Sequence, residues 1–415
     1  MYYLLFVFYF AIACFLITRI GFTKNTGLAP RLLLILFLLK IAAGILIGWM
    51  SQRFYPQGSD YWGLNVAGVE QQQLLLTNPK EFFNDIFRSS YDHGYSGFFN
   101  SNASYWNDLK NTLLIKFLAF CNFLSGGNYY INSLFFNFIG FFGHVALFRV
   151  FIDIYKNKKW PVIAGCFLLP STLYFTAGIH KDLVAFTMLG IYCFAIYFLV
   201  KCEWQTKHFI TLLASLVILV FIRNLLAMAL IPASLAFILS RKLRLNSILV
   251  FTITYCTGFV LLFLLQMAKP SIQPLKVITQ KQKDFFDLPY ASSQVDTYVL
   301  EPTIKSFLKN TPQALNHSLL RPYIWEHPTS FLIPLAIELL FYQLLFIFML
   351  FRHEREISFS PHPFILFGIF LSISLLLFTG FIVPNIGSIV RYRSLYLPFL
   401  IAPILCSIRY TRSGF

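Results

Sequence analysis

The sequence LLLILFLLKIAAGILIGWM, residues 32–50, contains nineteen residues and only one charge, Lys40. A run of about 20 apolar residues is long enough for a helix to cross the hydrocarbon core of a bilayer. Comparable blocks recur between residues 2 and 408, and the whole chain is 57% apolar and 12% charged. Soluble globular domains contain about 45–50% apolar and about 25% charged residues. The sequence therefore predicts an all-α, polytopic integral membrane protein.

About eleven apolar blocks predict membrane spans, with a range of 10 to 12. Two of the blocks, 209–222 and 225–240, are short and are separated only by Arg223 and Asn224. We count them as two spans, because a single broken span would move every later loop to the other side of the membrane. The predicted spans are 2–18, 32–50, 129–152, 161–178, 183–200, 209–222, 225–240, 246–267, 331–351, 363–383 and 395–408.

The positions of lysine and arginine predict the orientation of these spans. If the N-terminus is outside, each short segment on the inner side contains two or three basic residues. Short loops rich in Lys and Arg stay in the cytoplasm, so we expect an N-out, C-in topology and a single membrane domain over residues 1–415. Two long segments, 51–128 and 269–330, then lie outside, and the stretch Leu113–Leu124 predicts an interfacial helix in the first. We therefore attribute the net charge of +16 to basic residues that fix the orientation of the spans, and no nucleic acid partner is expected.

Ionisable residues near the ends of spans are the main candidates for chemistry. The chain contains no Walker A sequence, G-x-G-x-x-G, H-E-x-x-H or G-x-S-x-G. Its seven cysteines lie in or next to apolar blocks without a C-x-x-C pair, so no disulfide framework or zinc site is predicted. A charge at membrane depth is costly, which makes each such residue a functional candidate.

Two acidic residues are the first candidates. Asp60, in FYPQGSDYWGLNVAG, follows the second predicted span and could act as a general base, or cap a helix that begins near Tyr61. Asp182 follows His180 and Lys181 in PSTLYFTAGIHKDLVAF. This turn could bind an anionic head group or supply one metal ligand, or Asp182 could cap the next helix.

The second group of candidates consists of arginines and two glutamates. The planar guanidinium of arginine suits phosphate, although a single arginine at a helix end more often extends toward lipid head groups. An acid inside the 331–351 block needs a partner or a water-filled cavity. These candidates are Arg223, Arg321, Glu326, Glu338, Arg391 and Arg393.

The layout resembles the GT-C superfamily of membrane glycosyltransferases, which use lipid-phosphate-linked sugars. The resemblance depends on the many spans, on Asp60 soon after a span in a long outer segment, and on a second acidic turn at Asp182. The segments PSTLYFTAGIHKD, RPYIWE and NIGSIVRYR are also similar to membrane proteins of bacterial polysaccharide assembly. Two features depart from the family. The acidic segment follows the second predicted span instead of the first, and Asp60 stands alone where many members have paired acids.

The resemblance implies sugar transfer at the periplasmic face of the bacterial inner membrane, in cell-surface polysaccharide biosynthesis. The donor would be a polyprenyl-phosphate-linked sugar, and the acceptor a glycan or lipid. Asp60 would activate the acceptor hydroxyl, with inversion at the sugar. Lys181, Arg391 and Arg393 would stabilise the leaving phosphate. Whether the reaction needs a divalent metal such as Mg²⁺ or Mn²⁺ stays open. Asp60 and Asp182 are its candidate ligands.

Two alternatives to a transferase remain open. The first is a polymerase or ligase that acts on lipid-linked repeats and depends on the arginines, without an acidic base. The second is a flippase or transporter without bond chemistry, in which Lys40 and Glu338 line the path.

Overall fold

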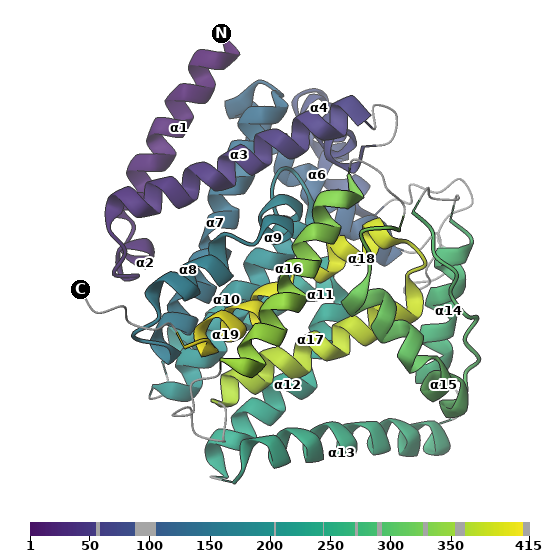
Figure 1. The fold of residues 1–415 in the computed structure, drawn as a ribbon. Helices are drawn as coiled ribbons and strands as arrows, with labels where there is room; N and C mark the ends of the chain where they lie inside the picture. The colour runs from purple at the N-terminus through teal and green to yellow at the C-terminus, as the bar shows by residue number, and fades with distance from the viewer. Residues whose placement is uncertain are drawn as a thin grey trace. The chain divides into compact units, whose positions relative to one another are not determined.

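The computed structural model describes residues 1–54, 59–87, 105–202, 205–243, 245–269, 273–288, 293–326, 331–352 and 362–409. Over these ranges the regular structure is helical, and an isolated β-bridge pairs Gln294 with Asn385. The predicted all-α fold is confirmed for this part of the chain (Figure 1).

Eight of the described helices are long and apolar enough to cross a membrane. They are α1 (Tyr2–Arg19), α3 (Pro30–Phe54), α7 (Tyr129–Ile154), α10 (Lys181–Lys201), α12 (Asn224–Lys242), α13 (Ser247–Ala268), α16 (Leu332–Phe351) and α17 (Pro363–Ile382). The pair α18 (Ile386–Arg393) and α19 (Leu397–Ser407) is bent by 62° and adds a ninth span if counted as one. These helices support a polytopic membrane protein, while the total of about eleven spans and their orientation stay predictions.

One predicted span is divided in the structure, and another lies in a helix of 17 residues. The 161–178 block is divided between α8 (Lys159–Phe167) and α9 (Pro170–Phe175). Pro170 opens α9, because proline lacks an N–H and restricts the residue before it, so helices rarely continue through it. The 209–222 block lies in α11 (Thr206–Ile222), which ends at Arg223 in a non-helical conformation with φ −143° and ψ 70°. The boundary predicted between the two short blocks is therefore confirmed.

The remaining helices are shorter or less apolar. The stretch Leu113–Leu124 lies within α6 (Tyr105–Ser125), so its helical structure is confirmed, while its interfacial position stays a prediction. The described part of the 269–330 segment contains two α-helices and a short π-helix, η2 (Asn316–Leu320). The other elements are α2 (Gly21–Lys24), α4 (Asp60–Thr77), α5 (Pro79–Asn84), η1 (Asp85–Phe87), α14 (Pro274–Phe286) and α15 (Ile304–Leu315).

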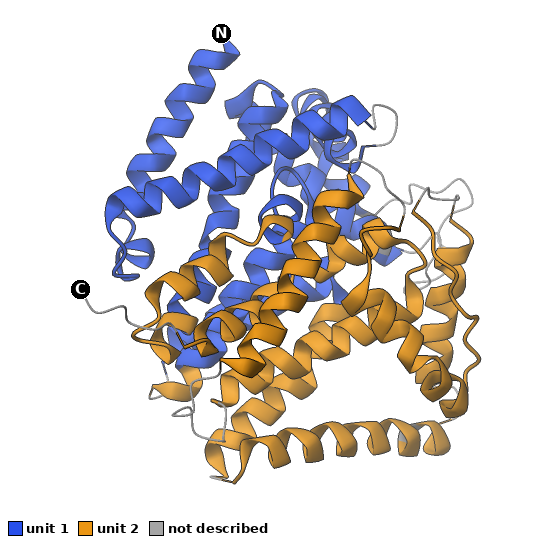
Figure 2. Ribbon diagram, viewed as in Figure 1, with its two compact units in different colours: residues 1–150, 172–198, 205–224 blue, residues 151–171, 199–204, 225–415 orange. Residues whose placement is uncertain are grey.

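The chain divides into two compact units (Figure 2). Unit 1 comprises residues 1–150, 172–198 and 205–224, and unit 2 comprises residues 151–171, 199–204 and 225–415. The single membrane domain over 1–415 stays a prediction. Unit 1 contains the candidates Asp60, Tyr61, His180, Lys181, Asp182 and Arg223, and unit 2 contains Arg321, Glu326, Glu338, Arg391 and Arg393.

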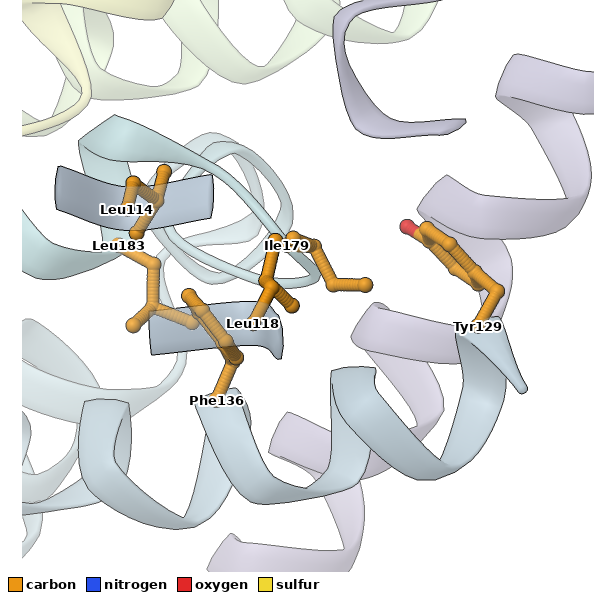
Figure 3. Close-up of a cluster of buried hydrophobic side chains, with 6 residues drawn as sticks. All are labelled: Leu114, Leu118, Tyr129, Phe136, Ile179 and Leu183. Carbon is orange, nitrogen blue, oxygen red and sulfur yellow. The ribbon is translucent and has the colours of Figure 1, made fainter. Parts of the chain in front are cut away.

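A hydrophobic core in unit 1 fixes the backbone next to the first group of candidates. Ile179 belongs to this core and directly precedes His180, and Tyr61 and Trp62 of α4 pack against it. The core therefore anchors both the helix that begins at Asp60 and the turn before α10. Its buried residues, drawn in Figure 3, are Leu114, Leu118, Tyr129, Phe136, Ile179 and Leu183.

Helices α7 and α10 approach each other closely in unit 1 at two glycines. A Cβ atom placed on Gly190 would overlap the carbonyl group of Gly143, and one placed on Gly143 would overlap the backbone of Thr187. Membrane helices often approach in this way, because small residues allow their backbones to come near.

Replacing Gly190 with alanine is expected to destabilise the protein by about 1–3 kcal/mol, since the new methyl group must push the two helices apart. The melting temperature of the purified protein in detergent micelles measures this loss. Gly258→Ala in α13 is the matched control, because a Cβ atom there meets nothing within 4 Å. Equal melting temperatures for the two variants would contradict the close approach of α7 and α10.

Candidate functional site

Asp60 is the first residue of α4, but it is not the cap of that helix. The N-cap is Ser59, whose hydroxyl accepts a hydrogen bond from the backbone N–H of Trp62 (3.4 Å). The alternative in which Asp60 is the cap is therefore wrong. The Asp60 side chain is 60% exposed. A carboxylate in the first turn of a helix is stabilised by the helix dipole, typically by about 0.3–1 kcal/mol.

Trp62 attaches the start of α4 to the end of α3. Its indole N–H donates to the carbonyl of Gly48 (2.9 Å), and its ring stacks on Tyr129, with ring centroids 4.2 Å apart and planes within 16°. The position of Asp60 is therefore fixed relative to α3 and α7.

His180 lies between the two acidic candidates. Its Nε2 atom is 3.7 Å from Oδ2 of Asp60, and its Nδ1 atom is 3.1 Å from Oδ2 of Asp182. Both His180 and Asp182 are fully buried. The ring of Tyr61 lies 4.8 Å from the imidazole, centroid to centroid, and restricts its rotation. The structure thus brings together two acids that are distant in the sequence.

The surroundings of the imidazole indicate that Nε2 has a proton. The backbone N–H of Asp182 donates to Nδ1 of His180 (3.1 Å). In a neutral histidine with Nδ1 as acceptor, the proton must be on Nε2. Nε2–H therefore faces Asp60, at a distance of 3.7 Å that is longer than a hydrogen bond.

Asp182 lies in the first turn of α10 and forms a short ion pair with Arg223. The contact joins Oδ1 of Asp182 to Nη2 of Arg223. The carboxylate is fully buried, whereas the arginine side chain is 24% exposed. A buried carboxylate needs such a partner, because its desolvation costs several kcal/mol. Arg223 is therefore the counter-ion of Asp182, and its contact with a substrate stays a prediction.

Lys40 supports the segment that leads to His180. It is buried in the middle of α3, and its ammonium group donates to the carbonyl oxygen and to Oγ1 (2.7 Å) of Thr176. Thr176 follows α9, and Gly178 then turns the chain with a φ of 73°. A left-handed φ is accessible to glycine at little cost. Lys40 thus donates to a carbonyl just past the end of α9, where no further helical turn supplies an N–H.

In unit 2 the candidate residues hold a turn that follows η2. Nε of Arg321 lies 3.3 Å from Oε1 of Glu326. The buried Arg393 donates through Nη1 to the carbonyls of Ser318 (2.9 Å) and Arg321 (2.8 Å). Arg393 is therefore engaged by the backbone of this turn.

Glu338, inside α16, also has protein partners. It accepts hydrogen bonds from the backbone N–H and the hydroxyl of Ser171, both at 3.0 Å, and from the hydroxyl of Tyr342 at 2.6 Å. These bonds account for an acid within an apolar helix and connect α16 to the first turn of α9. A role for Glu338 in substrate binding stays a prediction.

The two remaining basic candidates have contacts of their own. Lys181 donates to Oδ1 of Asn111 in α6 (3.2 Å), and the guanidinium of Arg391 lies 5.3 Å from the centre of the Tyr392 ring. Asn111 was missed by the sequence analysis, since nothing in the pattern around it distinguishes it from other polar residues of that helix.

The described residues do not fit a divalent metal site. Among them, no group of three or more His, Cys, Asp or Glu side chains is arranged to hold a metal ion. Asp60 and Asp182 are separated by His180, and Asp182 is engaged by Arg223. No known protein family matches the chain, and no curated protein or solved structure matches it.

Arg223→Gln is expected to destabilise the protein by about 3–5 kcal/mol, because it leaves the buried Asp182 without its cation. Asp182→Asn should cost less, since the partly exposed Arg223 can be hydrated. Thermal unfolding in micelles measures both, with the exposed Arg53→Gln as control. A larger loss for Asp182→Asn than for Arg223→Gln would refute this asymmetry.

The stability of unit 2 is expected to depend on pH through His317 in η2. Burial, together with the nearby Arg321, lowers the pKa of His317 from 6.5 to about 4. Its contribution is therefore present above pH 6.5 and is lost as the pH falls through about 4. Between pH 7 and about pH 4 the melting temperature of the wild type should fall more than that of His317→Gln. Parallel pH profiles for the two proteins would rule out this contribution.

Proposed function

We propose that the protein is a GT-C-like membrane glycosyltransferase, which moves a sugar from a polyprenyl-phosphate-linked donor to a hydroxyl of a glycan or lipid acceptor. The observation that most supports this proposal is the exposed carboxylate of Asp60, held beside the buried His180. A general base must be within hydrogen-bond reach of the acceptor hydroxyl, so it has to be accessible from outside the protein. Asp60 meets that condition, whereas the buried Asp182 does not.

The proposed reaction is a single displacement. The acceptor hydroxyl attacks the anomeric carbon, and Asp60 takes its proton. The bond from the anomeric carbon to the phosphate oxygen breaks in the same step, and its electron pair leaves with the polyprenyl phosphate. The anomeric centre is inverted, and the protonated Asp60 returns its proton to solvent.

The leaving phosphate needs positive charge more than it needs a proton. Lys181, next to Asp182 in unit 1, is the residue that we assign to this role. A contact of Arg391, in unit 2, with the phosphate stays a sequence-based prediction. Arg393 is less suitable than the sequence predicted, because it is buried and donates to two carbonyls.

His180 is a positioning residue in this proposal. Because it is fully buried, it does not reach the sugar, but its Nε2–H keeps the Asp60 carboxylate in place. The backbone N–H of Asp182 in turn holds the imidazole, and Arg223 pairs with the Asp182 carboxylate. This arrangement resembles other sites in which a base is oriented by a second polar group.

We assign the reaction to the outer face of the bacterial cytoplasmic membrane. The short basic segments favour an orientation in which residues 51–128, and with them Asp60, lie outside. The polyprenyl chain of the donor stays in lipid, and the product belongs to a cell-surface polysaccharide.

The two alternatives differ in the support that they receive. A polymerase or ligase that uses the arginines is favoured by the ordered Arg321–Glu326 pair in unit 2. A transporter would need Lys40 and Glu338 on its path, but both are hydrogen-bonded to protein groups. Nothing in the described residues supports the transporter.

Asp60→Asn is expected to reduce sugar transfer by about 10²–10⁴-fold, because the amide cannot take the proton. Glu70→Gln, an exposed acid farther along α4, is the matched control and should keep full activity. Both genes are expressed in a deletion strain, and the lipid-linked glycans that accumulate are analysed by mass spectrometry. Asp60→Asn should reproduce the pattern of the deletion. A wild-type pattern for Asp60→Asn, with loss of activity in Arg321→Ala, would favour the polymerase instead.

A further inference from the structure

Residues 321–326 of unit 2 form a tight turn that is held from several sides. The backbone N–H of Glu326 donates to the carbonyl of Tyr323 (3.0 Å), and the Glu326 carboxylate accepts from the backbone N–H of Tyr323 (3.4 Å). The hydroxyl of Tyr323 donates to Asn316 (2.6 Å), and Arg393 donates to the carbonyl of Arg321 (2.8 Å). The turn is thus ordered by contacts that include a buried cation.

This turn presents one aromatic face. The rings of Tyr323 and Trp325 are parallel within 5°, with centroids 5.1 Å apart. Trp325 is nevertheless 79% exposed, so Tyr323 supports one face of the indole and leaves the other accessible. Tyr323 is itself fixed through its hydroxyl, which keeps the orientation of the indole constant.

Charged side chains stand beside the two rings. The guanidinium of Arg321 is 5.9 Å from the centre of the Tyr323 ring, and Glu326 follows Trp325 directly. Arg321 and Glu326 form an ion pair and stay partly exposed. They offer hydrogen-bond donors and acceptors at the edge of a flat apolar surface.

We infer that the turn 321–326 is a binding platform for a sugar ring of a glycan, with the pyranose lying on Trp325 and its hydroxyls reaching Arg321 and Glu326. Ligand sites typically combine an apolar or aromatic wall with a few fixed polar groups. A tryptophan that only anchors the protein in lipid needs neither a supporting ring nor an ion pair beside it. The carboxylate of Glu326 would also be costly in the apolar layer.

The inference depends on the proposed class of substrate but not on the proposed base. A transferase and a polymerase must both hold a glycan, and Asp60 has no part in the platform. Binding is therefore measured directly, in the wild type and in Asp60→Asn, so that failure of the platform and failure of the general base give different results.

The experiment uses the full-length protein in nanodiscs of phosphatidylethanolamine and phosphatidylglycerol, with 5-fluorotryptophan at its six tryptophan positions. The probe is the pool of water-soluble oligosaccharides released by mild acid from the lipid fraction of the deletion strain. Fluorine NMR then follows each position, and Trp325→Phe identifies the signal of Trp325.

The expected result is a saturable shift of the Trp325 signal in both the wild type and Asp60→Asn. Trp325→Ala should weaken oligosaccharide binding at least about tenfold, as buried aromatic contacts in recognition sites commonly do. Trp160→Ala is the matched control in the same unit, since Trp160 is 67% exposed, and it should bind as the wild type does. The melting temperature of each variant confirms that it is folded.

Two results would overturn the inference. If Trp325 is broadened by spin-labelled lipid and does not respond to oligosaccharide, it is a membrane anchor. If Trp325→Ala binds oligosaccharide as tightly as Trp160→Ala does, the glycan is held elsewhere.

Discussion

The buried ion pair between Asp182 and Arg223 is the interaction on which the candidate site of unit 1 depends. It pairs the fully buried carboxylate at the start of α10 with a cation. The adjacent backbone N–H donates to the imidazole of His180. His180 then faces Asp60, the one exposed member of the series. Burying the Asp182 carboxylate costs several kcal/mol, and the pairing with Arg223 offsets this cost. The arrangement of His180 and Asp60 follows from the position of Asp182.

Lys40, Glu338 and Arg393 follow the same logic, because each one satisfies a helix end. Lys40 donates to a carbonyl that follows α9, where the negative end of the helix dipole favours a cation. Glu338 accepts from the N–H of Ser171 in the first turn of α9, where the positive end favours an anion. Arg393 donates hydrogen bonds to the carbonyls of Ser318 and Arg321, at the end of η2. Helix breaks inside an apolar environment are tolerated where side chains satisfy the released backbone groups.

Periodicity and composition predicted the parts of the structure that depend on local sequence. The long apolar helices and the break at Arg223 both depend on neighbouring residues. The 161–178 block was predicted as one span because its hydropathy outweighed Pro170.

Partners that lie far apart in the chain were not predictable in this way. The bond from Lys40 to Thr176 and the bonds from Ser171 to Glu338 depend on tertiary packing. The stacking of Trp325 on Tyr323 was not predictable either, because the sequence does not show which ring supports the indole. The choice of Ser59 over Asp60 as the helix cap was likewise decided by the backbone, since both residue types favour that position.

The link from Trp62 to Gly48 has a consequence for the depth of the reaction. Helix α3 has 25 residues, about 37 Å at 1.5 Å per residue, which exceeds the roughly 30 Å of a hydrocarbon core. A bilayer of different thickness is accommodated by tilt of such a helix. Because the indole ties the start of α4 to the last turns of α3, the acid would follow the lipid surface as α3 tilts. In the proposed reaction the phosphate of the lipid-linked sugar would follow that surface too, so Asp60 and the leaving phosphate would stay at the same depth in membranes of different thickness.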